Sequence, residues 1–132
     1  MHIEKKIEKL IVKEKYEEAL HLCETANTKK QSSPTIRLQH ARILHKLYRY
    51  KEAFDIIRTL DQSGDTLITE AAIIIDWCSD FLYKNYESPP YELEEFIKKA
   101  INICDKLIAE NKHKLQAMYF KLRQMGFLLS TR

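Results

Sequence analysis

The sequence predicts an all-α protein of three antiparallel helix pairs followed by a C-terminal helix. Apolar residues recur at spacings of three and four along nearly the whole chain, which is the period of an amphipathic helix. Only two Gly and three Pro occur among 132 residues, so few positions suit tight β-turns. Polar breaks between the apolar stretches divide the chain into helical segments.

The first helix pair is expected in a unit of about residues 1–31. Two apolar stripes, separated by the charged break "KEK" at residues 13–15, predict its helices. The stripes consist of Ile3, Ile7, Leu10 and Ile11, and then of Tyr16, Ala19, Leu20, Cys23 and Ala26.

The second pair is expected in a unit of about residues 33–63. Ser33 is suited to cap the first of its helices, with Pro34 at the first helical position, where a missing N–H loses no partner. Gly64, in the stretch "DQSGD", is predicted to end the unit with a left-handed cap. The apolar positions are Ile36, Ala41, Ile43, Leu44 and Leu47, followed by Tyr50, Ala53, Phe54, Ile57 and Leu60.

The third unit covers about residues 66–110, and a terminal helix covers 112–129. A long helix from about Thr66 to about Lys84 precedes the loop "NYESPP", where Ser again stands before Pro. The terminal helix either caps the preceding helices or is the first helix of a further pair. The apolar stripes are Leu93, Phe96, Ile97, Ala100, Ile101, Cys104, Leu107 and Ile108, and then Leu115, Met118, Leu122, Met125 and Leu129.

Composition and charge disfavour several classes of protein. Basic and acidic residues alternate, which is typical of solvated helix faces rather than of a polyanion-binding surface. No apolar run approaches the roughly 20 residues of a membrane span, and "MHIEKKIEKL" lacks the apolar region of a secretory signal. Three widely spaced cysteines, Cys23, Cys78 and Cys104, predict reduced, buried thiols in a cytoplasmic setting. At 132 residues the chain has the size of one domain, so we expect a single domain over residues 1–132.

Residues with catalytic or metal-binding chemistry form no recognisable pattern. His40 and His45 are five apart, whereas a spacing of four places two ligands on one helix face. The chain contains no G-x-S-x-G, no Gly-rich phosphate loop and no H-E-x-x-H. We therefore predict a protein that is not an enzyme and has neither a metal nor a cofactor.

Two stretches of the chain repeat one another, "KYEEALHLCETA" at 15–26 and "RYKEAFDIIRTL" at 49–60. The residues that recur 34 positions on are Tyr16, Glu18 and Ala19, as Tyr50, Glu52 and Ala53. A fixed interval of this size indicates stacked helical hairpins, because one hairpin cannot bury its own apolar face. In these residues the sequence resembles the tetratricopeptide repeat family, which implies a right-handed α-solenoid.

The resemblance assigns repeat positions in all three units, although the first helices match the family poorly. The third unit needs an insertion, because Ala53 and Ala100 are 47 apart rather than 34. The family's leading Trp is replaced by Ile3 and by Arg37. The assigned positions are Leu10, Tyr16, Ala19 and Cys23, then Ala41, Leu44, Tyr50, Ala53 and Ile57, and then Ala100 and Cys104.

The same resemblance implies a non-catalytic adaptor or scaffold that binds a peptide or a partner domain along the concave groove lined by first helices. A nucleic-acid partner is not favoured, because acidic residues lie among the central basic ones. The alternative is a structural assembly module that self-associates or docks through its C-terminal end and the region of Trp77. The predicted groove residues are Glu8, Leu38, Arg42, His45, Lys46 and Asp76.

Overall fold

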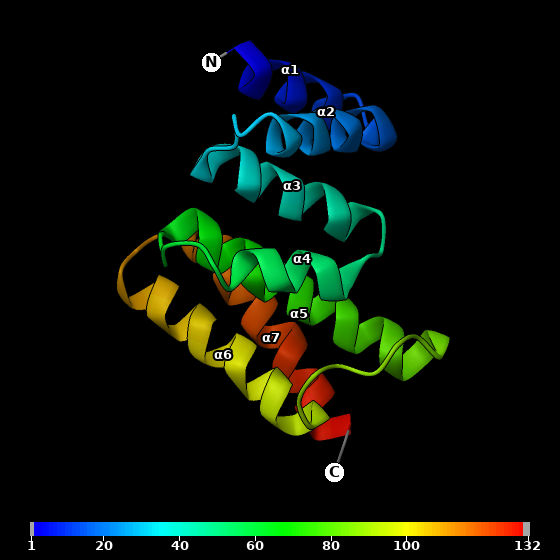
Figure 1. The fold of residues 1–132 in the computed structure, drawn as a ribbon. Coiled ribbons are helices and arrows are strands. Elements are labelled where there is room, and N and C mark those ends of the chain that lie inside the picture. The colour runs from blue at the N-terminus through cyan, green and yellow to red at the C-terminus, as the bar shows by residue number, and fades with distance from the viewer. Residues whose placement is uncertain (1, 131–132) are drawn as a thin grey trace. The chain divides into compact units, whose positions relative to one another are not determined.

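The computed structural model describes residues 2–130, which form seven helices and no strand (Figure 1). The predicted all-α class is confirmed. Chain contacts divide the protein between Leu60 and Asp61 into two compact units, which we call the N-terminal and C-terminal units. The helices are α1 (His2–Val12), α2 (Tyr16–Thr28), α3 (Pro34–Lys46), α4 (Tyr50–Ile57), α5 (Gly64–Lys84), α6 (Leu93–Ala109) and α7 (Lys114–Ser130).

The N-terminal unit consists of two helical hairpins, α1–α2 and α3–α4, whose consecutive helices run antiparallel (Figure 1). The helix α3 packs against α1, α2 and α4. Among the described residues of this unit, the backbone of α4 approaches only that of α3. A closed four-helix bundle would also bring α4 beside α1, so this unit is not such a bundle. Its buried apolar residues include Ile7, Ala19, Leu20, Cys23, Ala26, Ile36, Ala41, Ile43, Leu44, Tyr50, Ala53, Phe54 and Ile57.

The two hairpin turns of this unit have the same geometry and are separated by the interval of the sequence repeat. The N–H of Lys15 donates to the carbonyl of Leu10 at 2.8 Å, and the N–H of Arg49 donates to the carbonyl of Leu44 at 2.9 Å. Lys15 has φ −91° and ψ 67°, and Arg49 has φ −97° and ψ 66°. The repeated sequence is therefore accompanied by a repeated turn.

Both turns contain a non-glycine residue in the left-handed region, Glu14 with φ 58° and Tyr48 with φ 63°. Such a residue, followed by an N–H that bonds back five residues, closes a helix and satisfies its last carbonyls. Lys30 and Asn111 close α2 and α6 in the same way. Since these residues do what glycine usually does, the chain needs few glycines.

The predicted left-handed cap at Gly64 is wrong. No described glycine has a positive φ, and Gly64 is the first residue of α5 instead of a terminator after α4. The side chain of Ser63 accepts a hydrogen bond from the N–H of Thr66 at 3.3 Å and so caps the start of α5. The capping hydrogen bond of Ser63 thus sets the residue at which α5 begins.

The Ser33–Pro34 pair begins α3 as predicted, whereas the second Ser–Pro pair of the chain does not begin α6. Ser33 Oγ accepts the N–H of Ile36 at 3.1 Å, and Pro34 is the first residue of the helix. By contrast, α6 begins after Glu92, whose side chain makes no capping hydrogen bond. The Ser88–Pro89 pair therefore lies in the loop and does not start α6.

The C-terminal unit packs α5, α6 and α7 against one another, again with antiparallel neighbours (Figure 1). The rings of Trp77 on α5 and Phe96 on α6 lie nearly perpendicular to each other, with centroids 5.6 Å apart. The indole N–H of Trp77 donates to the carbonyl of Glu87 at 2.8 Å, which ties the "NYESPP" loop to α5. Trp77 is buried, so its side chain does not present an anchor to a partner; Tyr83 and Tyr91 are the exposed aromatic residues nearby.

The apolar stripe that predicts the terminal helix lies on its exposed side. Ala117 and Gln124 are the fully buried residues of α7 among those described. A spacing of three and four identifies one face of a helix but does not say whether another element covers it. The stripe residues Leu115, Met118, Leu122, Met125 and Leu129 are 83, 44, 69, 45 and 74% exposed.

Candidate interaction surfaces

The surface shared by α1 and α3 joins two of the predicted groove residues. Arg42 Nη1 lies 3.1 Å from Glu8 Oε1, and Nη2 lies 3.5 Å from Oε2, so the guanidinium faces both carboxylate oxygens. Partial burial raises the pKa of Glu8, but hydrogen bonds from Arg42 and Gln39 and the Arg42 charge outweigh it and hold the pKa below its ordinary value. Both side chains keep about two fifths of their exposure, 39% for Arg42 and 45% for Glu8. The pair is therefore accessible to a competing ligand.

Further polar contacts continue along the same interhelical seam. Gln39 Nε2 donates to the carbonyl of Glu4 at 3.0 Å and to Glu8 Oε1 at 3.3 Å. Ser33 Oγ lies 3.0 Å from Glu4 Oε1. Gln39 is buried, so its two hydrogen bonds across the seam fix α3 against α1.

The remaining predicted groove residues occupy different environments. Leu38, Arg42 and His45 follow one another at spacings of four and three, which places them on one side of α3. Leu38 and His45 are partly buried, whereas Lys46 is exposed at the end of the helix. Asp76 lies partly buried on α5, in the C-terminal unit. Of the six residues, Glu8 and Arg42 contact each other directly, while the ring of His45 lies 6.0 Å from that of Tyr50, centroid to centroid.

The eleven assigned repeat positions are mostly core residues. Nine are buried, while Leu10 and Tyr16 are partly buried. Ala19 and Ala53, the equivalent alanines of the two hairpins, are both fully buried. The first hairpin therefore buries its aromatic turn residue less completely than the second hairpin buries Tyr50.

All three cysteines are free and buried. Burial raises the pKa of Cys23 and of Cys78 to about 12 and that of Cys104 to about 11. A thiol with so high a pKa is almost wholly protonated at neutral pH and is a poor nucleophile and metal ligand. Among residues 2–130, no three His, Cys, Asp or Glu side chains group so that they could hold a metal ion.

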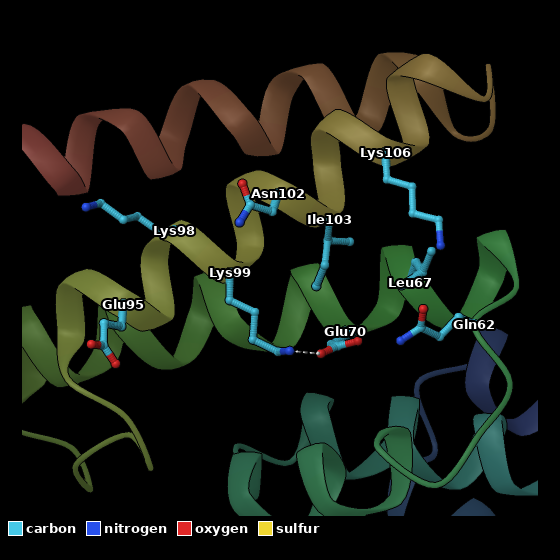
Figure 2. Close-up of a pocket in the computed structure, with 9 residues that line it drawn as sticks. All are labelled: Gln62, Leu67, Glu70, Glu95, Lys98, Lys99, Asn102, Ile103 and Lys106. Carbon is cyan, nitrogen blue, oxygen red and sulfur yellow. Dashed lines mark ion pairs between the residues drawn. The ribbon is translucent and has the colours of Figure 1, made fainter.

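A pocket of about 460 Å³ lies between α5 and α6 in the C-terminal unit (Figure 2). Lys99 points across it to the largely buried carboxylate of Glu70, with Nζ 3.6 Å from Oε2. Lys98, Lys106 and Glu95 also line it, so its charged groups are three ammonium and two carboxylate groups. This lining suits a small polar or acidic group, and no His, Cys, Ser or Asp is part of it.

Neither this pocket nor the contacts of Gln39 with α1 were predicted from the sequence. The pocket lysines stand on the polar side of the α6 stripe, where they look like ordinary solvated residues. Gln39 stands between apolar residues of α3, and only its contacts with α1 reveal its role. An apolar hollow of about 470 Å³ at Leu10 and Leu22, bordered by Glu17, Glu18 and His21, was likewise not predicted.

These helices and surfaces define an all-α protein of antiparallel helical hairpins. None of its described helices combines the length and the apolar composition that a bilayer crossing needs. No protein-family model, curated protein or solved structure matches the chain.

Proposed function

We propose that the chain is a non-catalytic adaptor of the tetratricopeptide type that binds a peptide or a partner domain on the surface shared by α1 and α3. The Glu8–Arg42 ion pair carries the proposal. Two residues one repeat interval apart lie side by side, so the first helices of successive hairpins present their side chains on one continuous surface. Recognition surfaces of this kind need no cofactor.

The equivalent hairpin turns support the repeat part of the proposal. Their hydrogen bonds and backbone angles match at the same interval as the repeated sequence. A right-handed α-solenoid built by continuing this arrangement is the fold that we propose for the chain. Protonated, buried thiols suit a reducing compartment, and we place the adaptor in the cytoplasm.

The α1–α3 surface favours a ligand of mixed character. Leu38 offers a partly buried apolar contact, and Arg42 and Lys46 offer positive charge. Because the Glu8–Arg42 pair is substantially exposed, its contribution to stability is small, on the order of 0–1 kcal/mol. An acidic side chain of a ligand can therefore replace Glu8 on Arg42 at little loss, while an apolar neighbour of that side chain packs on Leu38.

Charge reversal of the α1–α3 surface tests this proposal. The variant Arg42→Glu plus Lys46→Glu is compared with wild type and with Lys13→Glu plus Lys15→Glu, which makes the same charge change at exposed positions of the α1–α2 turn. Partners captured by the wild type are identified by mass spectrometry, purified, and titrated against all three proteins. We expect at least a tenfold loss of affinity for the first variant alone; equal affinity for all three would contradict the α1–α3 surface.

Assembly through the C-terminal end is the second candidate function, and the exposed apolar side of α7 favours it. Light scattering across a concentration series distinguishes self-association from the adaptor function. A protein that stays monomeric at tens of micromolar would argue against self-assembly.

A further inference from the structure

The exposed residues of α7 form a regular seam. Leu115, Met118, Leu122, Met125 and Leu129 are separated by three, four, three and four residues, which is the a and d pattern of a heptad repeat. All five are exposed, Leu115 most of all at 83%. We call these five residues the α7 seam. A strict two-in-seven pattern is narrower than the apolar face that most globular helices bury, and it matches the contact line of one helix on another.

The helix α7 has fewer neighbouring helices than α3, which has a similar place in the N-terminal unit. In the N-terminal unit, α3 packs on the two preceding helices and is covered by α4. In the C-terminal unit, α7 packs in the same way on α5 and α6, and no further helix of that unit covers it among the described residues. Among the described residues of its unit, α7 thus lacks the neighbour that α4 provides for α3.

The charges of α7 are of one sign. Between Lys114 and Ser130 the helix contains no Asp or Glu, and its charged residues are Lys114, Lys121 and Arg123. Lys114 and Lys121 stand one position before Leu115 and Leu122, which is the flanking g position of the heptads. Lys121 is already paired with Asp105 of α6, with Nζ 2.6 Å from Oδ1, so the helix recruits acidic groups within its own unit.

The other flank of the seam leaves room for a close neighbour. Tyr119, which follows Met118, is 58% exposed and offers an aromatic contact. Gly126, which follows Met125, has no atom within 4 Å of the place that a Cβ would occupy, apart from its chain neighbours and the backbone of its own helix. A partner backbone can approach closely at this point.

We propose that the α7 seam binds an amphipathic helix of a partner protein whose apolar stripe is flanked by Asp and Glu. The partner helix would lie on α7 as α4 lies on α3, with its apolar residues between those of the seam. Its carboxylates would lie beside Lys114 and beside Lys121, where a partner carboxylate would share the ammonium group with Asp105. This interaction adds a second surface to the proposed adaptor and does not depend on the Glu8–Arg42 surface.

Two other occupants fit the charges less well. A second copy of α7 would bring no acidic residue to pair with Lys114 and Lys121 and so gains nothing electrostatically. An anionic lipid surface would match the sign of the charge, but helices that lie in a membrane interface are rich in Lys and Arg on their polar face. The charged residues of α7 are only Lys114, Lys121 and Arg123, and Lys121 is already paired with Asp105.

Two designed peptides of about four heptads provide the test. Both have Leu at a and d; one has Glu at e and g, and the other has Lys there. Each is labelled and titrated against the full chain by fluorescence anisotropy. The variant Leu122→Gln is compared with Val12→Gln, which removes an apolar residue of similar exposure from α1.

We expect the Glu peptide to bind at least tenfold more tightly than the Lys peptide, and added salt to weaken it. Leu122→Gln should reduce its affinity at least tenfold, whereas Val12→Gln and the Arg42→Glu plus Lys46→Glu variant should bind as wild type does. Since Leu122 is exposed, its replacement should leave the helix content and the melting temperature unchanged.

Four results would overturn the proposal. These are equal binding of both peptides, no binding of either, unchanged binding by Leu122→Gln, and loss of binding by Arg42→Glu plus Lys46→Glu. A dimer that Leu122→Gln dissociates would assign the seam to a second copy. Leu122-dependent binding to phosphatidylserine vesicles without binding of the Glu peptide would assign it to a membrane.

Discussion

Glu8 and Arg42 lie at equivalent positions of successive hairpins and form an ion pair of 3.1 Å between α1 and α3. Their separation in the chain equals the one between the repeated Tyr and Ala residues of the two hairpins. Equivalent positions of successive hairpins are therefore neighbours in space, and here they have opposite charge. The coupling free energy between Glu8 and Arg42 is therefore a solution measurement that bears on the sequence repeat.

A double-mutant cycle on this pair should give a small coupling free energy. Glu8→Ala, Arg42→Ala and the double variant are unfolded by urea and followed by circular dichroism. Because both side chains are substantially exposed, we expect about 0.2–1 kcal/mol, reduced by salt. The reversed pair, Glu8→Arg with Arg42→Glu, should recover most of the loss of either single reversal. A coupling of zero at low salt, together with no recovery by the reversed pair, would mean that the pair does not form in solution.

Replacing Gln124 by Met should stabilise the C-terminal unit. The side chain is fully buried in α7, and its amide oxygen and nitrogen have no hydrogen-bond partner in the described structure. An unsatisfied buried amide costs about 1–3 kcal/mol, so its removal at nearly constant volume should raise the free energy of unfolding by a similar amount. Trp77 fluorescence during urea unfolding reports on this unit.

Gln116→Met, at an exposed position of the same helix, is the matched control and should change little. If Gln124→Met instead lowers stability, the amide is satisfied by a group such as a bound water.

His40 should make the protein less stable below neutral pH. Burial lowers the pKa of His40, with Glu24 and Glu52 acting to raise it and Arg49 acting to lower it further. In the unfolded chain this histidine takes up a proton at about pH 6.5, whereas in the folded protein it does so only at a lower pH. The free energy of unfolding therefore falls as the pH decreases from 6.5 toward the lowered pKa. Unfolding curves between pH 5 and 7.5 measure this slope.

His40→Gln should remove that slope while keeping the loss of stability below pH 4.5, which arises from the lowered pKa of Glu8 and Glu52. An unchanged slope in the variant would show that another group titrates.

The three thiols should be unreactive in the folded protein. Their raised pKa values and burial predict negligible reaction with Ellman's reagent at pH 8, and reaction of all three in guanidinium chloride. Above about pH 9 the unfolded chain loses thiol protons that the folded chain retains, so stability should fall as pH rises toward 11–12. A fast-reacting thiol at pH 8 would identify a locally open segment.

Glycine at a left-handed helix end should stabilise the N-terminal unit. Glu14 and Lys30 hold φ values of 58° and 56°, which a residue with a Cβ adopts at a cost of roughly 1 kcal/mol. Glu14→Gly and Lys30→Gly should each raise the melting temperature, whereas Lys13→Gly, one residue earlier, should not. A lower melting temperature for both left-handed sites would contradict this account of the turns.

The parts of the fold that depend on interactions between nearby residues could be predicted from the sequence. Ser33, Pro34 and the Tyr–Glu–Ala repeat act on residues a few positions away, and the helices and turns that they predict are present. Gly64 failed as a predicted cap because Ser63, one residue earlier, competes for the same backbone and bonds Thr66. The capping signal was also local, because a Ser just before an acidic first turn is typical of an N-cap.

The sequence by itself determined the all-α class, the positions of the seven helices, the interval of the repeat and the burial of the small residues within the hairpins. These features depend on helical period, capping and side-chain volume, which act over a few residues. Only the tertiary structure decided that Glu8 meets Arg42, that Gln124 lies in the interior and that Leu122 faces outward. Each of these depends on which helix lies against which face, and that is set by packing between distant segments, so no local pattern encodes it.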